Sequence, residues 1–253
     1  MIKRILSGLV MICLAILFFN YADKNISKII FLILSILSVI EFGRILKIGK
    51  AENIVMIFSA LFVFLYEDFS LEKKVLIVIL FDLILFFSWR IFKDKIDSKF
   101  IEYTAITMFF GIIPFYIMYI IFNTNKLSLL YVMLLVWIYD MAAYFTGITL
   151  GKNKLVPNIS PKKSWEGLIG ATIAVFAFSF IYYYNDLFIA RDIILLAFLV
   201  VFLAPIGDLT VSLLKRNNLI KDSGNIIPGH GGVLDRMDSF IFLVPIIFYI
   251  GVL

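Results

Sequence analysis

Long apolar runs alternate with short polar segments along the chain. Nine runs, with their flanking residues, approach the roughly 20 residues that a helix needs to cross a bilayer. They cover residues 5–19, 29–42, 54–66, 75–89, 103–122, 129–148, 168–184, 193–206 and 239–253. Backbone groups in lipid must be hydrogen-bonded within their own segment, and no alternating strand pattern is visible, so each run predicts a helix. The pattern predicts an all-α polytopic membrane protein with about nine transmembrane helices.

The charges of the connections predict how these helices are oriented. With nine spans, the N-terminus and the even-numbered connections share one side of the membrane, and that side contains 17 of the 23 Lys and Arg residues. Because cytoplasmic loops are enriched in Lys and Arg, we expect the N-terminus in the cytoplasm and the C-terminus outside. The expected location is the inner (plasma) membrane, with the polar connections 149–166 and 209–238 facing the cytoplasm.

Composition supports the membrane assignment and excludes a water-soluble domain. The chain has 253 residues, 62% of them hydrophobic, and a mean hydropathy of +1.04, which is more apolar surface than a soluble domain of this length can bury. A single cysteine, Cys13, excludes an internal disulfide framework. The basic and then apolar start resembles a signal peptide but lacks a small-residue cleavage site, so we expect it to be retained as the first helix.

Two long connections divide the chain by function. Residues 149–166 and 209–238 are rich in Gly, Pro, Ser and Lys, and long connections in compact proteins are more often functional than not. We therefore expect about five N-terminal transmembrane helices in residues 1–128 and a catalytic transmembrane region in residues 129–253.

Three carboxylates bracket the second of these connections. Asp208 ends the apolar run before it, whereas Asp235 and Asp238 stand three residues apart at its end and would share one face if that segment is helical. Carboxylates gathered at one interface form a hard oxygen site of the kind that binds Mg²⁺ together with substrate phosphates. The alternative, that each is an ordinary interfacial acid, stays open.

Basic residues and a glycine-rich turn lie between these carboxylates. The basic residues are Lys215, Arg216, Lys221 and Arg236, and the turn is "PGHGG", in which His230 precedes Gly231 and Gly232. Such basic residues can simply anchor a loop to anionic headgroups. Glycines, however, let backbone N–H groups approach an anion, and Lys and Arg suit a polyphosphate bound to Mg²⁺. The mixture predicts a phosphate-binding loop, in which His230 either contacts a phosphate or nucleotide or is structural.

A second polar cluster accompanies the other long connection. Asp140 lies within or near the end of an apolar run, where a carboxylate is costly, so it should face a cavity or a partner. A Gly147–Gly151 pair favours close helix packing over ligand binding. The segment "SPKKS" suits anion capture at the start of the next helix, through Ser160, Lys162, Lys163 and Ser164. Two further acids in apolar runs, Glu41 and Asp82, are assigned no catalytic role.

These polar segments resemble those of one enzyme family. The stretch "SLLKRNNLIKDSGNIIPGHGGVLDRMDS" is similar to the signature of phosphatidate cytidylyltransferases, also called CDP-diacylglycerol synthases. The upstream "DMAAYFTGITLGKNKLVPNISPKKSWEG" is similar to a second block of the same family. The N-terminal half resembles the family only in being a set of membrane helices.

The resemblance implies a reaction, a cofactor and roles for residues. CTP and phosphatidate would give CDP-diacylglycerol and pyrophosphate with Mg²⁺, a second metal ion being left open, in a nine-helix protein that is often dimeric and binds membrane lipid but no nucleic acid. Asp208 and Asp235 would be metal ligands, with Asp238 either a third ligand or a residue that supports the ligands. Lys215 and Lys221 would act in catalysis with them. Arg216 and His230 would bind substrate. From the two polar clusters themselves we expect the same of Gly231, Gly232, Arg236, Ser160, Lys162, Lys163, Ser164 and Asp140.

Other membrane proteins fit less well. A polyprenol kinase-like protein or a CDP-archaeol synthase-like enzyme would also use CTP, but the complete His-Gly-Gly and Asp-Arg-x-Asp pattern fits the phosphatidate enzyme better. CDP-alcohol phosphotransferases carry an Asp-Gly-x-x-Ala-Arg element that this sequence lacks. A transporter would explain many spans and buried acids, but it would not need a phosphate-binding basic loop on one face.

Overall fold

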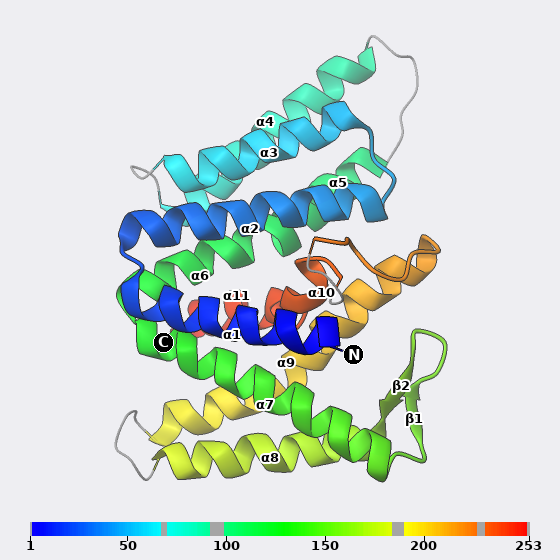
Figure 1. Cartoon of the computed structure of the whole chain (residues 1–253). Helices are drawn as coiled ribbons and strands as arrows, with labels where there is room; N and C mark the ends of the chain where they lie inside the picture. The colour runs from blue at the N-terminus through cyan, green and yellow to red at the C-terminus, as the bar shows by residue number, and fades with distance from the viewer. Residues whose placement is uncertain (1, 67–69, 92–98, 184–189, 227–230, 252–253) are drawn as a thin grey trace. The chain divides into compact units, whose positions relative to one another are not determined.

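The computed structural model describes residues 2–66, 70–91, 99–183, 190–226 and 231–251, and these are mostly helical (Figure 1). The helices are α1 (Ile2–Tyr21), α2 (Lys24–Ile45), α3 (Lys50–Leu65), α4 (Leu71–Ile91), α5 (Lys99–Ile106), the π-helix η1 (Thr107–Ile112), α6 (Ile113–Thr124), α7 (Lys126–Thr149), α8 (Trp165–Tyr183), α9 (Ala190–Asn217), α10 (Leu234–Met237) and α11 (Phe240–Ile250). Two strands, β1 (Lys154–Val156) and β2 (Ser160–Ser164), form an antiparallel hairpin. The predicted helical class is confirmed, because every predicted apolar run lies mainly in a helix.

Several helices are long and apolar enough to cross a membrane. In the described part of the chain four meet this condition by length and composition: Lys24–Ile45, Ile101–Thr124, Lys126–Thr149 and Asp192–Asn217. The second of them is continuous through α5, η1 and α6. Shorter apolar helices cover Gly8–Tyr21, Trp165–Ile181 and Phe240–Ile250. The membrane character expected from composition is therefore present in the helices themselves.

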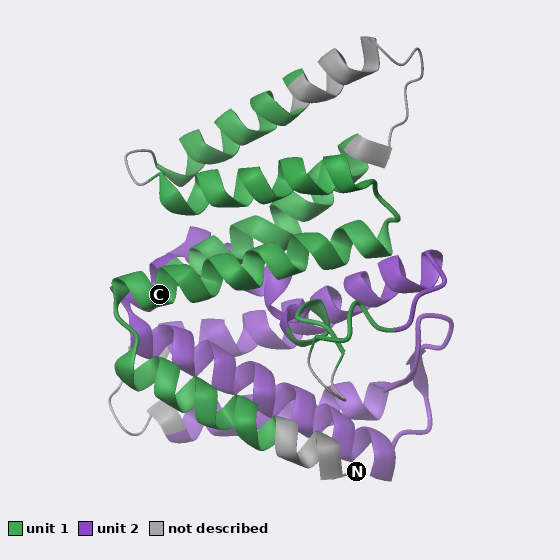
Figure 2. Ribbon diagram, turned by 45° about the horizontal axis from the view of Figure 1, so that its top comes forward, with its two compact units in different colours: residues 1–119, 222–236 green, residues 120–221, 237–253 purple. Residues whose placement is uncertain are grey.

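The chain forms two compact units (Figure 2). Unit 1 contains residues 1–119 and 222–236, and unit 2 contains residues 120–221 and 237–253. The chain thus leaves unit 2 after Lys221, contributes a segment to unit 1, and returns to unit 2 at Met237. The functional division predicted at residue 128 is a different kind of division and stays a prediction.

In unit 1, α2 packs against α3 and η1 through fully buried side chains such as Val39 and Phe42. Polar side chains inside this packing find partners on neighbouring helices. The Ser35 hydroxyl donates to the carbonyl of Gly111 at 2.9 Å. Lys74, fully buried near the start of α4, donates to the Tyr116 hydroxyl at 2.6 Å. Buried polar groups are expensive without hydrogen bonds, so these pairs fix how the apolar helices meet.

In unit 2, α7 and α8 pack closely at a crossing made of glycines. A Cβ atom on Gly167 would lie 2.9 Å from the carbonyl oxygen of Ala143, and the Cα of Gly147 is the next backbone atom nearby. The close helix packing predicted for Gly147 is therefore confirmed.

The hairpin of β1 and β2 connects these two helices, with Val156 paired to Ser160 and Lys154 to Ser164. The sequence analysis did not predict this hairpin.

Candidate active site

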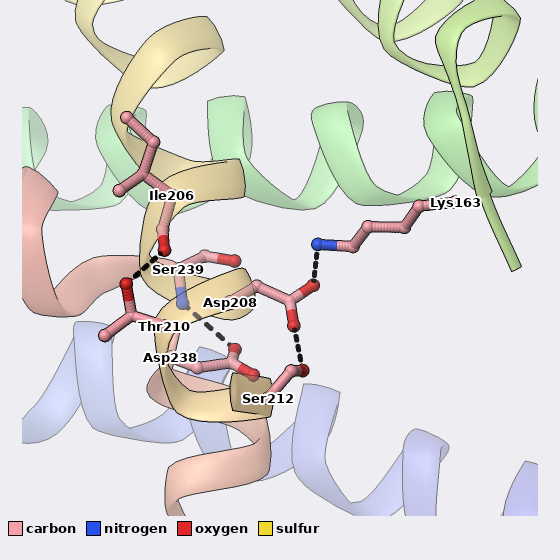
Figure 3. A network of polar contacts seen from close by, with 7 residues as sticks. All are labelled: Lys163, Ile206, Asp208, Thr210, Ser212, Asp238 and Ser239. Atoms are coloured by element: carbon pink, nitrogen blue, oxygen red, sulfur yellow. Dashed lines mark hydrogen bonds and ion pairs between the residues drawn. The ribbon is translucent and has the colours of Figure 1, made fainter. Parts of the chain in front are cut away.

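A polar network in unit 2 centres on Asp208, in the second half of α9 (Figure 3). Its Oδ2 lies 2.6 Å from the Nζ atom of Lys163, and its Oδ1 accepts a hydrogen bond from Ser212, one helical turn later, at 3.2 Å. Lys163 belongs to β2, so the hairpin delivers a lysine to the carboxylate on α9. Two residues predicted from different loops, one as a metal ligand and one as a phosphate binder, are direct neighbours here.

Asp238 joins this network from the turn between α10 and α11. Its Oδ1 accepts a hydrogen bond from the backbone N–H of Ser239 at 3.0 Å (Figure 3). Gly207, directly before Asp208, brings α9 against this turn, because a Cβ atom at Gly207 would overlap the carbonyl oxygen of Asp238. The missing side chain at Gly207 is therefore what allows the two aspartates to approach each other.

The charges around Asp238 oppose one another. Burial is the main cause that raises the pKa of this carboxyl to about 8, and the negative charges of Asp208 and Asp140 raise it further. Lys215, which is only 7% exposed, acts in the opposite direction. The carboxyl of Asp238 thus interacts electrostatically with Asp208, Asp140 and Lys215 within unit 2. Another positive charge would be stabilising here.

The donor set of unit 2 fits a hard divalent cation. Asp208 and Asp238 supply carboxylate oxygens, the ligands that Mg²⁺ prefers, and their mutual repulsion is relieved by a cation. Within the described ranges, however, no three His, Cys, Asp or Glu side chains are grouped closely enough to hold a metal ion. The three-carboxylate site with Asp235 therefore stays a prediction.

Asp235 accepts hydrogen bonds from residues of unit 1. Its Oδ2 accepts hydrogen bonds from the backbone N–H groups of Ser223 and Gly232, each at 2.9 Å. Gly231 has a φ of +87°, and a Cβ atom there would overlap Asp235 Oδ2. In the structure, the glycines that the sequence analysis assigned to an anion surround the carboxylate of Asp235. The helix expected to place Asp235 and Asp238 on one face ends at Met237, before Asp238.

Two further predicted residues make structural contacts. Arg216 donates to the backbone carbonyls of Ile159 at 3.4 Å and of Ile220 at 3.2 Å. The buried Ser164 hydroxyl accepts the N–H of Gly167 at 3.1 Å, so it caps the start of α8. Each of these contacts uses a group that the sequence analysis assigned to substrate.

The remaining predicted binders differ in exposure. Lys162, Lys221 and Arg236 are exposed, and Ser160 is half-buried at the start of β2. His230 lies outside the described residues. The structure thus leaves the substrate roles of all of these residues as predictions.

The sequence analysis missed one acid that contacts the signature segment. Glu41, near the end of α2, is 2% exposed and accepts hydrogen bonds from residues of the 222–236 segment. The available signal was its ionisable side chain within an apolar run, which is by default a sign of function. Asp82, the other such acid, is paired internally with the hydroxyl of Ser59 at 3.2 Å.

Comparisons with known proteins match the same enzyme family as the motifs. A family model described as "Cytidylyltransferase family" matches residues 2–253. A phosphatidate cytidylyltransferase of Haemophilus influenzae is 50% identical over 127 residues, which cover 48% of this chain and 44% of that protein. Those of Pseudomonas aeruginosa and Bacillus subtilis are 46% identical over 119 residues and 42% identical over 134 residues, and cover 46% and 51% of this chain and 44% and 49% of the relatives. The chain thus matches about half the length of each of these curated relatives.

Proposed function

This chain belongs to the cytidylyltransferase family, and from that premise we propose that it transfers the cytidylyl group of CTP to phosphatidate. The products would be CDP-diacylglycerol, which stays in the membrane, and pyrophosphate. Two findings support this choice of substrates: the names of the matching relatives, and the location of Asp140 and Asp208 on the long apolar helices α7 and α9.

The observation that carries the proposal is the charge arrangement in unit 2. Asp208 and Asp238 are neighbouring carboxylates, and Lys163 and Lys215 are cations beside them. Transfer between phosphates requires little covalent chemistry from the protein, since positioning and charge neutralisation provide most of the catalysis. A site with carboxylates for a cation and lysines for phosphate oxygens meets that requirement.

The proposed chemistry is a displacement at the α-phosphorus of CTP. A phosphate oxygen of phosphatidate forms the new bond, the bond from the α-phosphorus to the oxygen that bridges to the β-phosphorus breaks, and pyrophosphate leaves with the electron pair. The attacking phosphate is already an oxyanion, so little deprotonation is needed. Lys163 and Lys215 would then bind phosphate oxygens and stabilise the charge that develops on pyrophosphate.

A divalent cation fits this scheme through residues of this chain. Asp208 and Asp238 would hold it, and the resemblance also assigns Asp235 to it. When bound, Mg²⁺ would supply Lewis-acid neutralisation of the phosphate charges.

The orientation in the membrane is part of the proposal. We infer nine spans in the inner membrane, with the N-terminus and the site on the cytoplasmic side, where CTP is found. The support is the distribution of Lys and Arg: with nine spans, 17 of the 23 would face the cytoplasm. In a Cys13→Ala background, cysteines at the exposed Lys152 and Asn225 should react with an impermeant thiol reagent only in inverted vesicles. Reaction in intact cells would contradict this orientation.

The function is tested by an assay with competing acceptors. Purified protein in nanodiscs is given radiolabelled CTP, Mg²⁺ and either phosphatidate, a polyprenol or an archaeal lipid acceptor, and label in the chloroform phase is counted. We expect label with phosphatidate only. If label appeared only with another acceptor, that acceptor and not phosphatidate would be the substrate. If no acceptor gave label, the proposed function would be rejected.

A further inference from the structure

Glu41 of α2 holds a segment that lies more than 180 residues later in the chain. Its Oε1 accepts the backbone N–H of Val233 at 2.8 Å, and its Oε2 accepts the N–H of Leu234 at 2.9 Å. The Ser223 hydroxyl is 2.7 Å from the same Oε2. Bonds from backbone N–H groups to a carboxylate are charge-assisted and stronger than bonds between neutral groups. Both oxygens of this buried side chain thus bind described residues of this segment, Ser223, Val233 and Leu234.

Two glycines allow the segment to pass directly over the Glu41 carboxylate. A Cβ atom on Gly224 would lie 2.7 Å from Glu41 Oε1, and one on Gly232 would overlap the carboxylate oxygens of Glu41 and the hydroxyl of Ser223. Side chains at these positions would push the backbone away from α2. The sequence of the segment is therefore fitted to a carboxylate at position 41.

Ser223 connects Glu41 to Asp235. Its hydroxyl lies between Glu41 Oε2, at 2.7 Å, and Asp235 Oδ2, at 3.0 Å, and its single proton serves one of them at a time. The backbone N–H of Ser223 also donates to Asp235 Oδ2 at 2.9 Å. Glu41 moreover binds the N–H of Leu234, the residue directly before Asp235. Glu41 thus acts on Asp235 from two directions, through Ser223 and through the start of α10.

We propose that Glu41 is a positioning residue of the reaction, which fixes the orientation of Asp235 by holding Ser223, Val233 and Leu234. The inference rests on the proposed function, in which Asp235 is a metal ligand. Its contacts support this role over general stabilisation. Glu41 binds Leu234, which directly precedes Asp235, and Ser223, which itself donates to Asp235. Partners that orient metal ligands typically change metal affinity or activity by about 10- to 100-fold when they are replaced.

Glu41→Gln is the informative substitution. It keeps the size of the side chain but replaces one acceptor oxygen by an NH₂ group, which would face an N–H donor of the segment. We expect a kcat lower by about 10- to 100-fold and a higher Mg²⁺ concentration for half-maximal activity. The KM for phosphatidate should change little. Ser223→Ala, which removes only the bridging hydroxyl, should shift the Mg²⁺ requirement in the same direction by a smaller factor.

Hydrogen exchange supplies a second measurement that does not depend on activity. In nanodiscs, peptides covering residues 222–236 should exchange faster in Glu41→Gln than in the wild type, whereas peptides from α3 should not change. Glu72→Gln, at an exposed position in the first turn of α4, is the matched control and should leave both exchange and activity unaltered.

Distinct outcomes would overturn the inference. Unchanged exchange of residues 222–236 in both Glu41→Gln and Ser223→Ala would show that Glu41 does not hold the segment. Faster exchange across all of unit 1, with an unchanged Mg²⁺ requirement, would reduce Glu41 to a purely structural residue. If the wild-type protein transfers no cytidylyl group, the proposed function fails, and the exchange data still decide whether Glu41 orders the segment.

Discussion

Individual atoms set the geometry of the two carboxylate clusters. In unit 2, the absence of a Cβ atom at Gly207 lets the backbone of Asp238 contact α9, next to Asp208. In unit 1, Gly232 does the same for the carboxylate of Glu41. Neither glycine is needed for a positive φ, since only Gly231 and Gly251 have that conformation among the described glycines. Their role is to allow close approach, which makes both positions sensitive to a single methyl group.

Gly207→Ala should therefore be harmful although alanine is the better helix former. The new methyl group would displace Asp238 from Asp208, so we expect a lower melting temperature and a loss of most transfer activity. Gly8→Ala, in α1, is the matched control, because a Cβ atom there meets no atom within 4 Å. That variant should be neutral or gain up to about 1 kcal/mol from helix propensity. Equal melting temperatures and activities for the two variants would refute the proposed packing.

The raised pKa of Asp238 predicts a pH dependence of stability. Burial and the neighbouring Asp208 raise the pKa of this carboxyl to about 8 in the folded protein, well above the ordinary range for an aspartate. The folded state then binds the proton more tightly than the unfolded state, so its stability falls as pH rises towards 8. In thermal unfolding without divalent cations, the wild type should lose stability between pH 6 and 8, and Asp238→Asn should lose less. Equal slopes for the two proteins would contradict the assignment.

At the scale of elements, the sequence predicted the helices but not the small structures that position the site. Apolar runs make helices because lipid leaves the backbone no other partner, and residues 129–148, for example, lie within α7. The strand Ser160–Ser164 is short, polar and without alternation, so no pattern distinguished it from a loop. It pairs with β1 in a local hairpin, and this strand brings Lys163 to Asp208.

The same limit applied to the candidate site. Sequence identified Asp208, Asp238, Lys163 and Lys215 by residue type and by resemblance, and the structure gathers these four in unit 2. The hydrogen bond between Ser223 and Glu41 could not be predicted from the sequence, because the two residues are 182 positions apart and no local pattern connects them. Contacts between distant segments are what a single sequence leaves undetermined.

The crossing of α7 and α8 gives a prediction at this scale. Gly167→Ala places a methyl group 2.9 Å from the carbonyl oxygen of Ala143, so the helices must separate, and the adjacent end of β2 should move with them. Gly147→Ala meets its nearest atom, Ser164 Oγ, at 3.4 Å, which is ordinary contact. We expect a clearly lower melting temperature for Gly167→Ala than for Gly147→Ala. The reverse order would contradict the packing at this crossing.

In the whole molecule, the polar stretch of residues 222–238 contributes to both compact units. Residues 222–236 belong to unit 1, where Asp235 is held by Ser223 and Gly232. Asp238 belongs to unit 2, with Asp208 and Lys215 as its charged neighbours. Closeness in sequence had predicted a single cluster of carboxylates. In the structure α10 ends at Met237, between the two carboxylates, and the single cluster stays a prediction.

In the proposed function, the carboxylate of Asp208 on α9 serves cytidylyl transfer to phosphatidate. The most direct test compares the wild type with Asp208→Asn in the same nanodiscs, with labelled CTP, phosphatidate and Mg²⁺, after both have been shown to be folded by their melting curves. We expect Mg²⁺-dependent label in CDP-diacylglycerol for the wild type and almost none for Asp208→Asn. Substantial transfer by a folded Asp208→Asn protein, or none by the wild type, would contradict it.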